Sequence, residues 1–335
     1  MIRYTSFMKP MIDDFIKYQT ASQCWSENPF GRNLKTFENH CLKNFPNQNK
    51  LIQEMVNSWC TQRDTELNKS YITRIKVVDK KIPQNFNDCK ILHVSDLHNR
   101  EFGMKQFVLI DHIKKLKPDY IFITGDLIDR NRINLKKALL LIEGIRGLAP
   151  IYYVTGNHEW QSGKAGARLL NELKKLDVYI LHDEKTFLYR KGQRIQVIGM
   201  DDPYILKSKK SKKYDRVTSR EFLKRFLSVT RDRGREYTIL LSHRPEFIHF
   251  YQKAKINLVF SGHAHGGQIR VPGIGGLLSP HQGFFPKYAE GMVKEGNTKM
   301  IVSRGLGNSC FPFRINNPPE LVIVELKKKG KDNIL

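Results

Sequence analysis

The sequence predicts an α/β (or α+β) protein in which a mixed or largely parallel sheet is covered by helices. From about residue 71, short runs rich in β-branched residues alternate with stretches of helical periodicity, a pattern typical of βαβ units. Several of these runs are almost continuously apolar, which indicates strands buried on both faces. The first 68 residues show helical periodicity alone, so we predict a small all-α segment before the α/β domain.

The segment 1–68 contains three groups of apolar residues at helical spacing. The groups are Phe7, Met11, Phe15 and Ile16, then Leu34, Phe37, Cys41 and Leu42, and then Leu51, Met55, Val56 and Trp59. Apolar side chains three or four residues apart share one face of a helix. The stretches "SENPFGRN" and "NFPNQN" separate the groups with helix-breaking Pro, Gly and Asn. We therefore expect three short amphipathic helices joined by loops.

The segment 71–328 carries the alternating pattern. The runs "CKILHV", "DYIFIT" and "PIYYVT" predict strands, and the intervening "KQFVLIDHIKKL" and "LKKALLLIEGIR" predict helices. Five later runs predict further strands: "IQVIGM", "YTILLS", "INLVFS", "KMIVSR" and "ELVIVEL". The stretch "LKSKKSKKYDR" predicts a basic solvated loop, and residues 329–335 predict a basic tail.

The charge of the chain is strongly positive. Its 335 residues include 57 Lys and Arg against 33 Asp and Glu, a formal net charge of +24. This excess favours anionic partners such as phosphorylated substrates, nucleic acid or an acidic membrane surface, but a lysine-rich solvated surface would give the same charge. Charge therefore selects no function by itself.

The sequence lacks the features of secretion and of membrane insertion. The five cysteines are odd in number and form no CxxC pair, which argues against a disulfide framework or a zinc ribbon. The first thirty residues include Asp13, Asp14 and Glu27 and no apolar core of a signal peptide, and no run of about 18 apolar residues occurs. We expect a cytoplasmic protein, either free or bound peripherally to a membrane.

Polar residues follow five predicted strands at the point where each strand ends. They are Ser95-Asp96-Leu97-His98-Asn99 after "ILHV", Gly125-Asp126 after "YIFIT", Gly156-Asn157-His158-Glu159 after "IYYVT", His243 after "TILLS", and Gly262-His263-Ala264-His265 after "NLVFS". A lone Asp or His after a strand is commonly a helix cap or a surface group, but chance would not place five groups at the same relative position. Because the carboxyl ends of the strands form the ligand crevice of open α/β sheets, we expect these side chains to converge.

The converging set contains carboxylates, an asparagine and several imidazoles, but no thiolate. A mixed nitrogen and oxygen set suits borderline divalent metals, namely Mn, Fe, Zn or Ni. Seven or more ligands are too many for one ion and suit two ions that share a bridging carboxylate. Two ions roughly 3.5–4 Å apart can clamp both the attacking and the leaving oxygen of a phosphoryl displacement. The pattern thus predicts a two-metal centre.

In this order, the blocks "DLH", "GD", "GNHE", "SH" and "GHAH" resemble the signature blocks of the calcineurin-like metallophosphoesterases. The resemblance covers about residues 71–328. The stretches "GHAHGGQIRVPGIGGLLSPHQGFFPKY" and "SRGLGNSCFPFRINNPPELVIVEL" are similar to one bacterial branch, the YkuE- and YaeI-like phosphoesterases. The resemblance implies a sandwich of two mixed β-sheets flanked by helices, and a hydrolase acting on phosphoric ester bonds.

The resemblance also assigns the metal ligands, block by block. The residues that resemble ligands of the first ion are Asp96, His98 and His265, those that resemble ligands of the second ion are Asn157, His243 and His263, and Asp126 resembles the bridging carboxylate. His263 and His265 would therefore serve two adjacent ions, one each. A hydroxide that bridges the ions would attack phosphorus in line.

Other residues receive roles outside the ligand set. His158 resembles the family's residue that stabilises the transition state and protonates the leaving oxygen. Glu159 is expected to orient His158, or else to be a solvated turn residue. His281, in a glycine- and aromatic-rich loop, is expected to line a substrate pocket, whereas the acidic pair Asp201-Asp202 is expected to be structural.

The helical start departs from the bacterial branch, whose members often begin with a membrane anchor or an export signal. The stretches "NPFGRNLKTFENHCLKNF" and "LIQEMVNSWCTQRDTELNKS" are instead similar to the helical N-terminal DNA-clamping domain of tyrosine recombinases, without that family's catalytic Arg, His and Tyr constellation. The sequence therefore resembles a fusion with its junction between about residues 66 and 76. The module either delivers the enzyme to DNA through phosphate contacts or is a remnant without a role.

Two function classes follow. The first is a dinuclear-metal-dependent phosphohydrolase, most simply a phosphodiesterase or pyrophosphohydrolase, acting on a phosphorylated small molecule or lipid. The alternative is a DNA-binding fusion protein in which the phosphoesterase domain is ancillary. A metal-binding scaffold without activity is disfavoured, because every expected ligand and His158 are present. The residues select neither the substrate, the native metals nor the oligomeric state.

Overall fold

The computed structural model describes residues 71–206, 216–231, 234–268, 270–271, 275–276, 278–279, 282–308, 314 and 316–330. The predicted all-α segment 1–68, with its expected DNA contacts, lies outside the described residues, as does most of the predicted basic loop. The domain boundaries on either side of residue 70 therefore stay a prediction.

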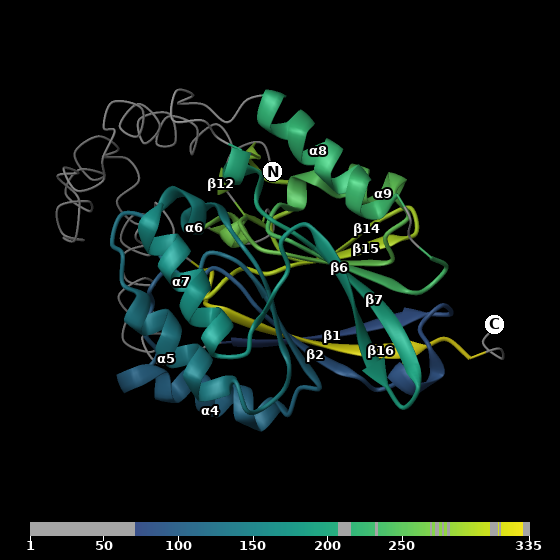
Figure 1. The fold of residues 1–335 in the computed structure, drawn as a ribbon, viewed down its shortest axis with the longest axis horizontal. Helices are drawn as coiled ribbons and strands as arrows, with labels where there is room; N and C mark the ends of the chain where they lie inside the picture. The colour runs from purple at the N-terminus through teal and green to yellow at the C-terminus, as the bar shows by residue number, and fades with distance from the viewer. Residues whose placement is uncertain are drawn as a thin grey trace.

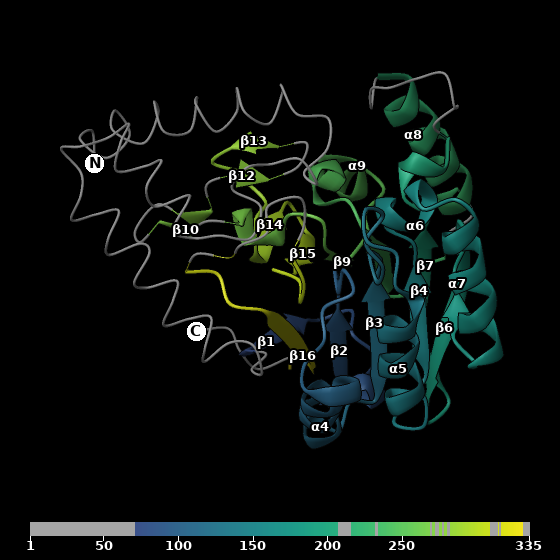
Figure 2. The same cartoon turned by 90° about the vertical axis from the view of Figure 1, so that its left-hand side faces the viewer.

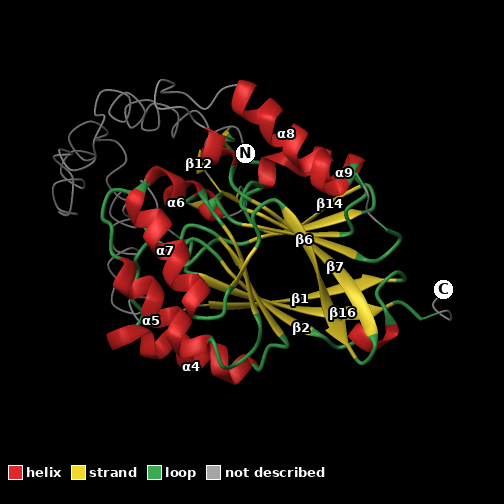
Figure 3. Ribbon diagram, viewed as in Figure 1, coloured by secondary structure: helices red, strands yellow, loops and turns green. Residues whose placement is uncertain are grey.

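Two mixed sheets, each of six strands, form the centre of the molecule (Figures 1 and 3). The first sheet has the order β1 (Tyr71–Asp79), β16 (Glu320–Lys328), β2 (Lys90–Val94), β3 (Tyr120–Thr124), β4 (Ile151–Val154) and β5 (Tyr179–Ile180). The second has the order β14 (Gly291–Glu295), β15 (Thr298–Val302), β9 (Leu258–Ser261), β8 (Thr238–Ser242), β7 (Gln193–Met200) and β6 (Glu184–Arg190). This confirms the predicted α/β sandwich of two mixed sheets.

The directions of the strands place the carboxyl ends of β2, β3 and β4 at one edge of the first sheet, and those of β8 and β9 at one edge of the second. In the first sheet β2, β3, β4 and β5 run parallel, and β16 is antiparallel to β2. In the second sheet β7, β8, β9 and β15 run parallel, while the outer strands β6 and β14 are antiparallel to their neighbours. Segments that leave β2, β3 and β4, or β8 and β9, therefore emerge from the same edge of their own sheet.

Helices cover the outer faces of the sandwich (Figure 1). On the first sheet they are α4 (Phe107–Leu116), α5 (Leu135–Ile145) and α7 (Lys164–Lys175), with the short α6 (Asn157–Gln161) before α7. On the second sheet they are α8 (Arg216–Thr230) and α9 (Ile248–Lys253). No helix in the described part of the chain is long and apolar enough to cross a membrane.

Short elements complete the chain. Single-turn 3₁₀ helices are η3 (Gln84–Phe86), η4 (Met104–Gln106), η5 (Pro203–Leu206), η6 (Pro245–Phe247) and η7 (His265–Gly267). Two small antiparallel pairs follow η7, namely β10 (Arg270–Val271) with β11 (Gly275–Gly276), and β12 (Leu278–Ser279) with β13 (Gly283–Phe284). Figure 2 shows these pairs beside β14 and β15.

The core between the sheets is built from the strand runs that the sequence marks as continuously apolar. All residues of β3 and β8 are buried. Phe122 of β3 and Phe260 of β9 meet edge to face across the sandwich, with ring centroids 5.2 Å apart, a favoured geometry for aromatic pairs. Burial on both faces explains why these strands show no alternation of polar and apolar residues.

The edge strands are among the elements not predicted from the sequence, as are the helices α7, α8 and α9. β6 has exposed or half-exposed side chains at six of its seven positions, and β1 alternates between exposed and less exposed residues. A strand at the edge of a sheet needs fewer apolar residues, because one side of it has no neighbour. The apolar runs therefore predict the central strands and miss the outer ones.

Candidate metal centre

The five strand ends that the sequence singles out come together where the two sheets meet. Nδ1 of His243, at the end of β8, donates to the carbonyl oxygen of Thr124, at the end of β3, over 2.6 Å. The amide of His263, after β9, lies 3.2 Å from both carboxylate oxygens of Asp96, after β2. The predicted convergence is therefore present, but across two sheets rather than along one.

Glycines allow this close approach. A Cβ atom on Gly125, whose φ is +85°, would lie 2.2 Å from the amide nitrogen of Gly156, and one on Gly262 would lie 2.0 Å from Oγ of Ser95. Both distances are shorter than any real carbon contact, so only glycine fits at these two crossings. They hold β3 against β4, and β9 against β2.

Backbone strain concentrates at the same place. Five of the predicted site residues have a left-handed φ between 45° and 66°: Asp96, His98, Asp126, His263 and His265. Residues other than glycine rarely adopt this region, and each such residue costs of order 1 kcal/mol or more. Strained backbone of this kind is common at functional sites, where the direction of a side chain matters more than the stability of the fold. A cluster of ligand residues is such a site.

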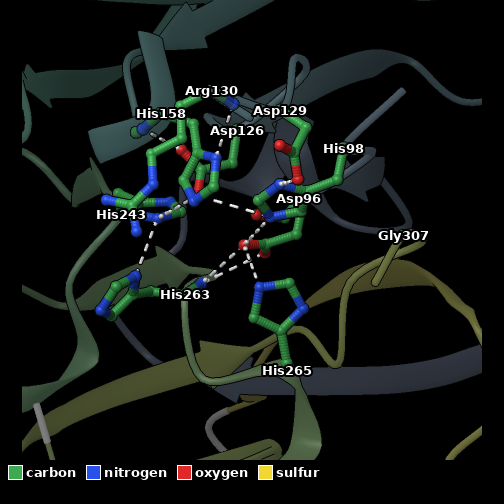
Figure 4. Close-up of polar contacts among 12 residues, drawn as sticks. Asp96, His98, Asp126, Asp129, Arg130, His158, His243, His263, His265 and Gly307 are labelled. Carbon is green, nitrogen blue, oxygen red and sulfur yellow. Dashed lines mark hydrogen bonds and ion pairs between the residues drawn. The ribbon is translucent and has the colours of Figure 1, made fainter. Parts of the chain in front are cut away.

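A first cluster consists of Asp96, His98 and His265, all buried (Figure 4). Nε2 of His265 lies 3.3 Å from Oδ1 of Asp96, and Nε2 of His98 lies 3.8 Å from the same oxygen. The potential ligand atoms of the three residues all lie within 4.8 Å of one another. This spacing fits ligands that point at a common ion.

A second cluster consists of Asp126, His243 and His263. Nε2 of His243 lies 3.3 Å from Oδ2 of Asp126 and 3.1 Å from Nδ1 of His263. The same Oδ2 atom lies 3.5 Å from Nε2 of His98, which belongs to the first cluster. Asp126 therefore stands between the two clusters, as a bridging carboxylate must.

The outer nitrogen of His243 matches that of a metal ligand. A ligating histidine donates its other ring N–H to a carbonyl or carboxylate. Nδ1 of His243 donates to the Thr124 carbonyl, which leaves Nε2 directed at Asp126. Nδ1 of His98 lies 3.8 Å from Oδ2 of Asp129, which is beyond hydrogen-bond distance, and its Nε2 lies 3.5 Å from Oδ2 of Asp126. Asp129 was not singled out in the sequence, although it lies three residues after Asp126.

Several polar atoms at the site are buried without a hydrogen-bond partner among the described residues. They are Nε2 and Nδ1 of His98, Nδ1 of His265 and Oδ1 of Asn157. Asn157 is the first residue of α6 and is 6% exposed. Because buried polar groups are normally satisfied, atoms of this kind fit ligands of an ion. The residues present thus fit a pair of divalent cations.

Charge and burial set the protonation of the site. Burial lowers the pKa of His158 and of His265 to about 3, so both rings are neutral. Burial acts against ionised Asp126, but the imidazoles of His243 and His158 lower its pKa well below the ordinary value. Burial likewise acts against a charge on His243, yet Asp126 raises the pKa of that ring to about 10. Ion binding at Nε2 of His243 would therefore displace a proton.

His158 is held in one tautomer. Its Nδ1 accepts the backbone N–H of Arg130 over 3.1 Å, so the ring proton of the neutral imidazole lies on Nε2. That Nε2 lies 4.0 Å from Oδ2 of Asp126. The side chain thus presents a proton donor to the centre of the site. The orienting group is a backbone amide, which sequence patterns do not reveal.

The Glu159 carboxylate binds backbone amides, whereas the sequence predicts that it orients His158 or is solvated. Oε2 accepts the amides of Asp126 and Gly156 over 2.9 and 2.8 Å, and Oε1 accepts the amide of Leu127 over 2.9 Å. Glu159 is 2% exposed, so it is not a solvated turn residue. It does not orient His158 directly; it joins the loop after β3 to the loop after β4 and so positions both Asp126 and α6.

A buried arginine supports the second cluster. Nη1 of Arg244 donates to Nε2 of His263 over 2.7 Å, and its Nε and Nη2 donate to the carboxylate of Asp202 over 2.5 and 3.1 Å. Because a guanidinium only donates, Nε2 of His263 is the acceptor and its ring proton lies on Nδ1. For Nδ1 to bind an ion, this proton would move to Nε2, and Arg244 would then have to release that nitrogen.

The two residues of the acidic pair, Asp201 and Asp202, have different contacts. Asp201 accepts from Thr155 over 2.6 Å and lies 2.9 Å from Nδ1 of His182, contacts that hold β7 against β4. Asp202 holds Arg244 and so acts on His263 through it. No sequence pattern predicts the second task, although Arg244 directly follows His243.

Replacing Asp202 with alanine is expected to lower the free energy of unfolding by roughly 3 kcal/mol, because it removes the carboxylate that accepts two hydrogen bonds from the fully buried Arg244. The Glu246 carboxylate, 3.6 Å from Nη1 of Arg244, makes no such pair of hydrogen bonds. Equilibrium denaturation in urea measures this loss. Glu236→Ala breaks the solvent-exposed pair of Glu236 with Arg194 and should cost much less. An Asp202→Ala protein as stable as the parent would show that Arg244 does not depend on Asp202.

The structure does not describe His281, whose expected place in a substrate pocket stays a prediction. His93 is buried outside both clusters, and its Nε2 lies 2.8 Å from Oγ1 of Thr124. His182 is held by Asp201. Both have structural contacts, as expected for histidines outside the ligand set.

Comparison with known proteins gives consistent matches. Residues 89–267 match the family described as Calcineurin-like phosphoesterase. The uncharacterized metallophosphoesterase YkuE of Bacillus subtilis (strain 168) is 31% identical over 255 residues, which cover 73% of this chain and 82% of that protein. The uncharacterized metallophosphoesterase Cj0846 of Campylobacter jejuni is 31% identical over 261 residues, 76% of this chain and 63% of that protein. Phosphodiesterase YaeI of Escherichia coli (strain K12) is 26% identical over 243 residues, 71% of this chain and 82% of that protein.

Proposed function

Because this chain belongs to the calcineurin-like phosphoesterase family, a family of hydrolases that act on phosphoester bonds, we propose that it is a phosphodiesterase or pyrophosphohydrolase that depends on two divalent cations. The single observation that carries the proposal is the position of Asp126. Its Oδ2 lies 3.5 Å from a ring nitrogen of the first cluster and 3.3 Å from one of the second.

The proposed ligands are Asp96, His98 and His265 for one ion and Asn157, His243 and His263 for the other, with Asp126 shared. When bound, the ions would supply Lewis-acid polarisation of the phosphoryl group and a nucleophile generated from water at neutral pH. Manganese, iron, zinc and nickel all accept such a nitrogen and oxygen set.

The chain itself supplies the proton for the leaving group. His158 is neutral, with its proton on Nε2 and its Nδ1 bound to the Arg130 amide. Its Nε2–H would stabilise charge on the phosphoryl oxygens by hydrogen bonding. To protonate the departing oxygen, the ring would first take up a second proton on Nδ1, in place of the Arg130 amide, and would return to the neutral imidazole when it gives up the Nε2 proton. Glu159 holds the loops that carry Asp126 and His158 in register.

The similarity to phosphodiesterase YaeI supports a diester substrate, and the positive net charge of +24 supports an anionic one. A lipid and a nucleotide both satisfy these conditions. The alternative of a DNA-binding fusion rests on residues 1–68, outside the described part of the chain, and stays a prediction.

Metal removal tests the proposal directly. Protein stripped with a chelator is expected to lose hydrolysis of bis-p-nitrophenyl phosphate, and Mn²⁺ should restore it, because the proposed nucleophile depends on bound cations. Elemental analysis of the reconstituted protein should find two ions per chain. Protein with two bound ions that hydrolyses neither this diester nor p-nitrophenyl phosphate would contradict the proposal.

A further inference from the structure

The N-terminal ends of α4 and α5 carry large apolar side chains in solvent. Met104 in η4 is 83% exposed, Phe107 at the start of α4 is 71% exposed, and Ile133, just before α5, is 49% exposed. Scattered exposed apolar residues are ordinary, but a group of them on one face commonly marks an interaction surface. Neither the core nor the proposed catalytic site uses these three side chains.

The backbone between Met104 and Phe107 is strained, and hydrogen bonds of a buried side chain hold it in place. Lys105 and Gln106 have consecutive left-handed φ angles of 54° and 65°, which non-glycine residues rarely adopt. The Gln106 side chain is fully buried, donates to the carbonyl oxygens of Arg100 and Lys137, and accepts the amide of Phe102. The hydrogen bonds of Gln106 fix the turn, and Met104 and Phe107 on either side of it stay outside the core.

The two segments lie side by side, as Figure 2 shows for α4 and α5. Gln106 donates to the Lys137 carbonyl over 3.1 Å, and the Lys137 ammonium lies 3.4 Å from Glu101. Asn99 donates to the carbonyl of Arg132, which joins the residue after His98 to the loop before α5. The apolar group therefore sits on the two segments that leave the proposed metal site.

Exposed cations lie on the same segments as this apolar group. Lys105, Arg132 and Lys136 are exposed on the same two segments. The nearby acid Glu101 is engaged with the Lys105 amide and with Lys137. The surface thus combines exposed apolar and cationic side chains, a combination that matches an anionic lipid surface.

A groove continues the surface between α5 and α7, with a volume of about 830 Å³. It begins at Ile133 and Asn134 and is lined by apolar side chains that include Leu139. Its charged lining is mixed: Lys136, Lys164 and Arg168 stand with Glu143 and Glu172. The apolar character of the surface therefore extends along the helices.

We propose that this docking surface, made of Met104, Lys105, Phe107, Arg132, Ile133 and Lys136, binds anionic lipid bilayers. The apolar side chains enter the boundary between headgroups and acyl chains, and the cations bind the anionic headgroups. Nucleic acid would engage the cations but would leave Met104 and Ile133 in water, so the lipid surface is the better match. The inference concerns binding and does not rest on the hydrolytic activity.

The test is sedimentation of the full chain with vesicles of phosphatidylcholine, with and without phosphatidylglycerol. We expect binding that requires phosphatidylglycerol and weakens with salt. The double variant Met104→Ser/Phe107→Ser should bind roughly tenfold more weakly or worse, because it removes two inserting side chains. Lys105→Gln, a change at an exposed position, should weaken binding and reduce its salt dependence.

Leu227→Ser is the matched control, because Leu227 is 53% exposed on α8, away from the docking surface. It should bind vesicles as the parent does. Equal vesicle binding by the parent and by both surface variants would overturn the proposal, as would equal binding with and without phosphatidylglycerol. Binding of the parent to single- or double-stranded DNA but not to vesicles would assign the surface to nucleic acid instead. Hydrolysis of bis-p-nitrophenyl phosphate, measured on the same samples, tests the enzyme separately.

Discussion

Asp126→Asn is expected to reduce metal-dependent hydrolysis about 10³-fold or more, because two ions cannot share an amide as they share a carboxylate. The change is nearly isosteric. The asparagine oxygen can keep the bond that Oδ1 of Asp126 accepts from the His158 amide over 2.8 Å. Its nitrogen would then take the place of Oδ2, facing the ring nitrogens of His98 and His243. The fold should survive while the bridge is lost.

Turnover of bis-p-nitrophenyl phosphate and the number of ions per chain would be measured together. Asp119→Asn is the matched control, since Asp119 directly precedes β3 at its other end and binds Arg190 there. We expect Asp119→Asn to keep both ions and full turnover. If Asp126→Asn retained two ions and parental turnover, Asp126 would not be the bridging ligand.

His158→Asn is expected to cost about 10²–10⁴-fold in hydrolysis of diesters with poor leaving groups, the range typical of a lost general acid. The asparagine oxygen can still accept the Arg130 amide, as Nδ1 of His158 does, but the Nε2 proton is gone. A p-nitrophenolate leaving group needs little protonation, so for that substrate the loss should shrink to roughly tenfold.

The dependence on the leaving group separates proton donation from a structural role. A variant that only misplaced the site would lose the same factor for every leaving group, and that result would remove His158 from the role of acid. The control is His249→Asn, because His249 is exposed on α9. Its rates should equal those of the parent for the whole series of diesters.

The central strands, and the polar residues that follow each of them, could be predicted from local sequence. β3 and β8 are buried along their whole length, so each appears as an uninterrupted apolar run that ends in Asp126 or His243 within two residues. Burial and strand direction are properties of a short stretch of chain. The same local logic missed β6, where most side chains are partly exposed and leave no apolar run.

The contacts that make these residues a site could not be predicted in this way. The tautomer of His158 depends on the Arg130 amide, that of His243 depends on the Thr124 carbonyl, and His263 depends on Arg244. The first two partners are backbone groups, one at the end of β3 and one in the loop after it, and residue type does not reveal which histidine a backbone group will meet.

The sequence by itself determined which residues end the central strands, and through their order it determined the fold class and the family. Only the tertiary structure decided how those ends meet. β2, β3 and β4 belong to one sheet and β8 and β9 to the other, so the two clusters form only when the sheets pack face to face. The physical reason is that residue type and periodicity encode burial locally, whereas hydrogen-bond direction between distant segments exists only after packing fixes their backbones.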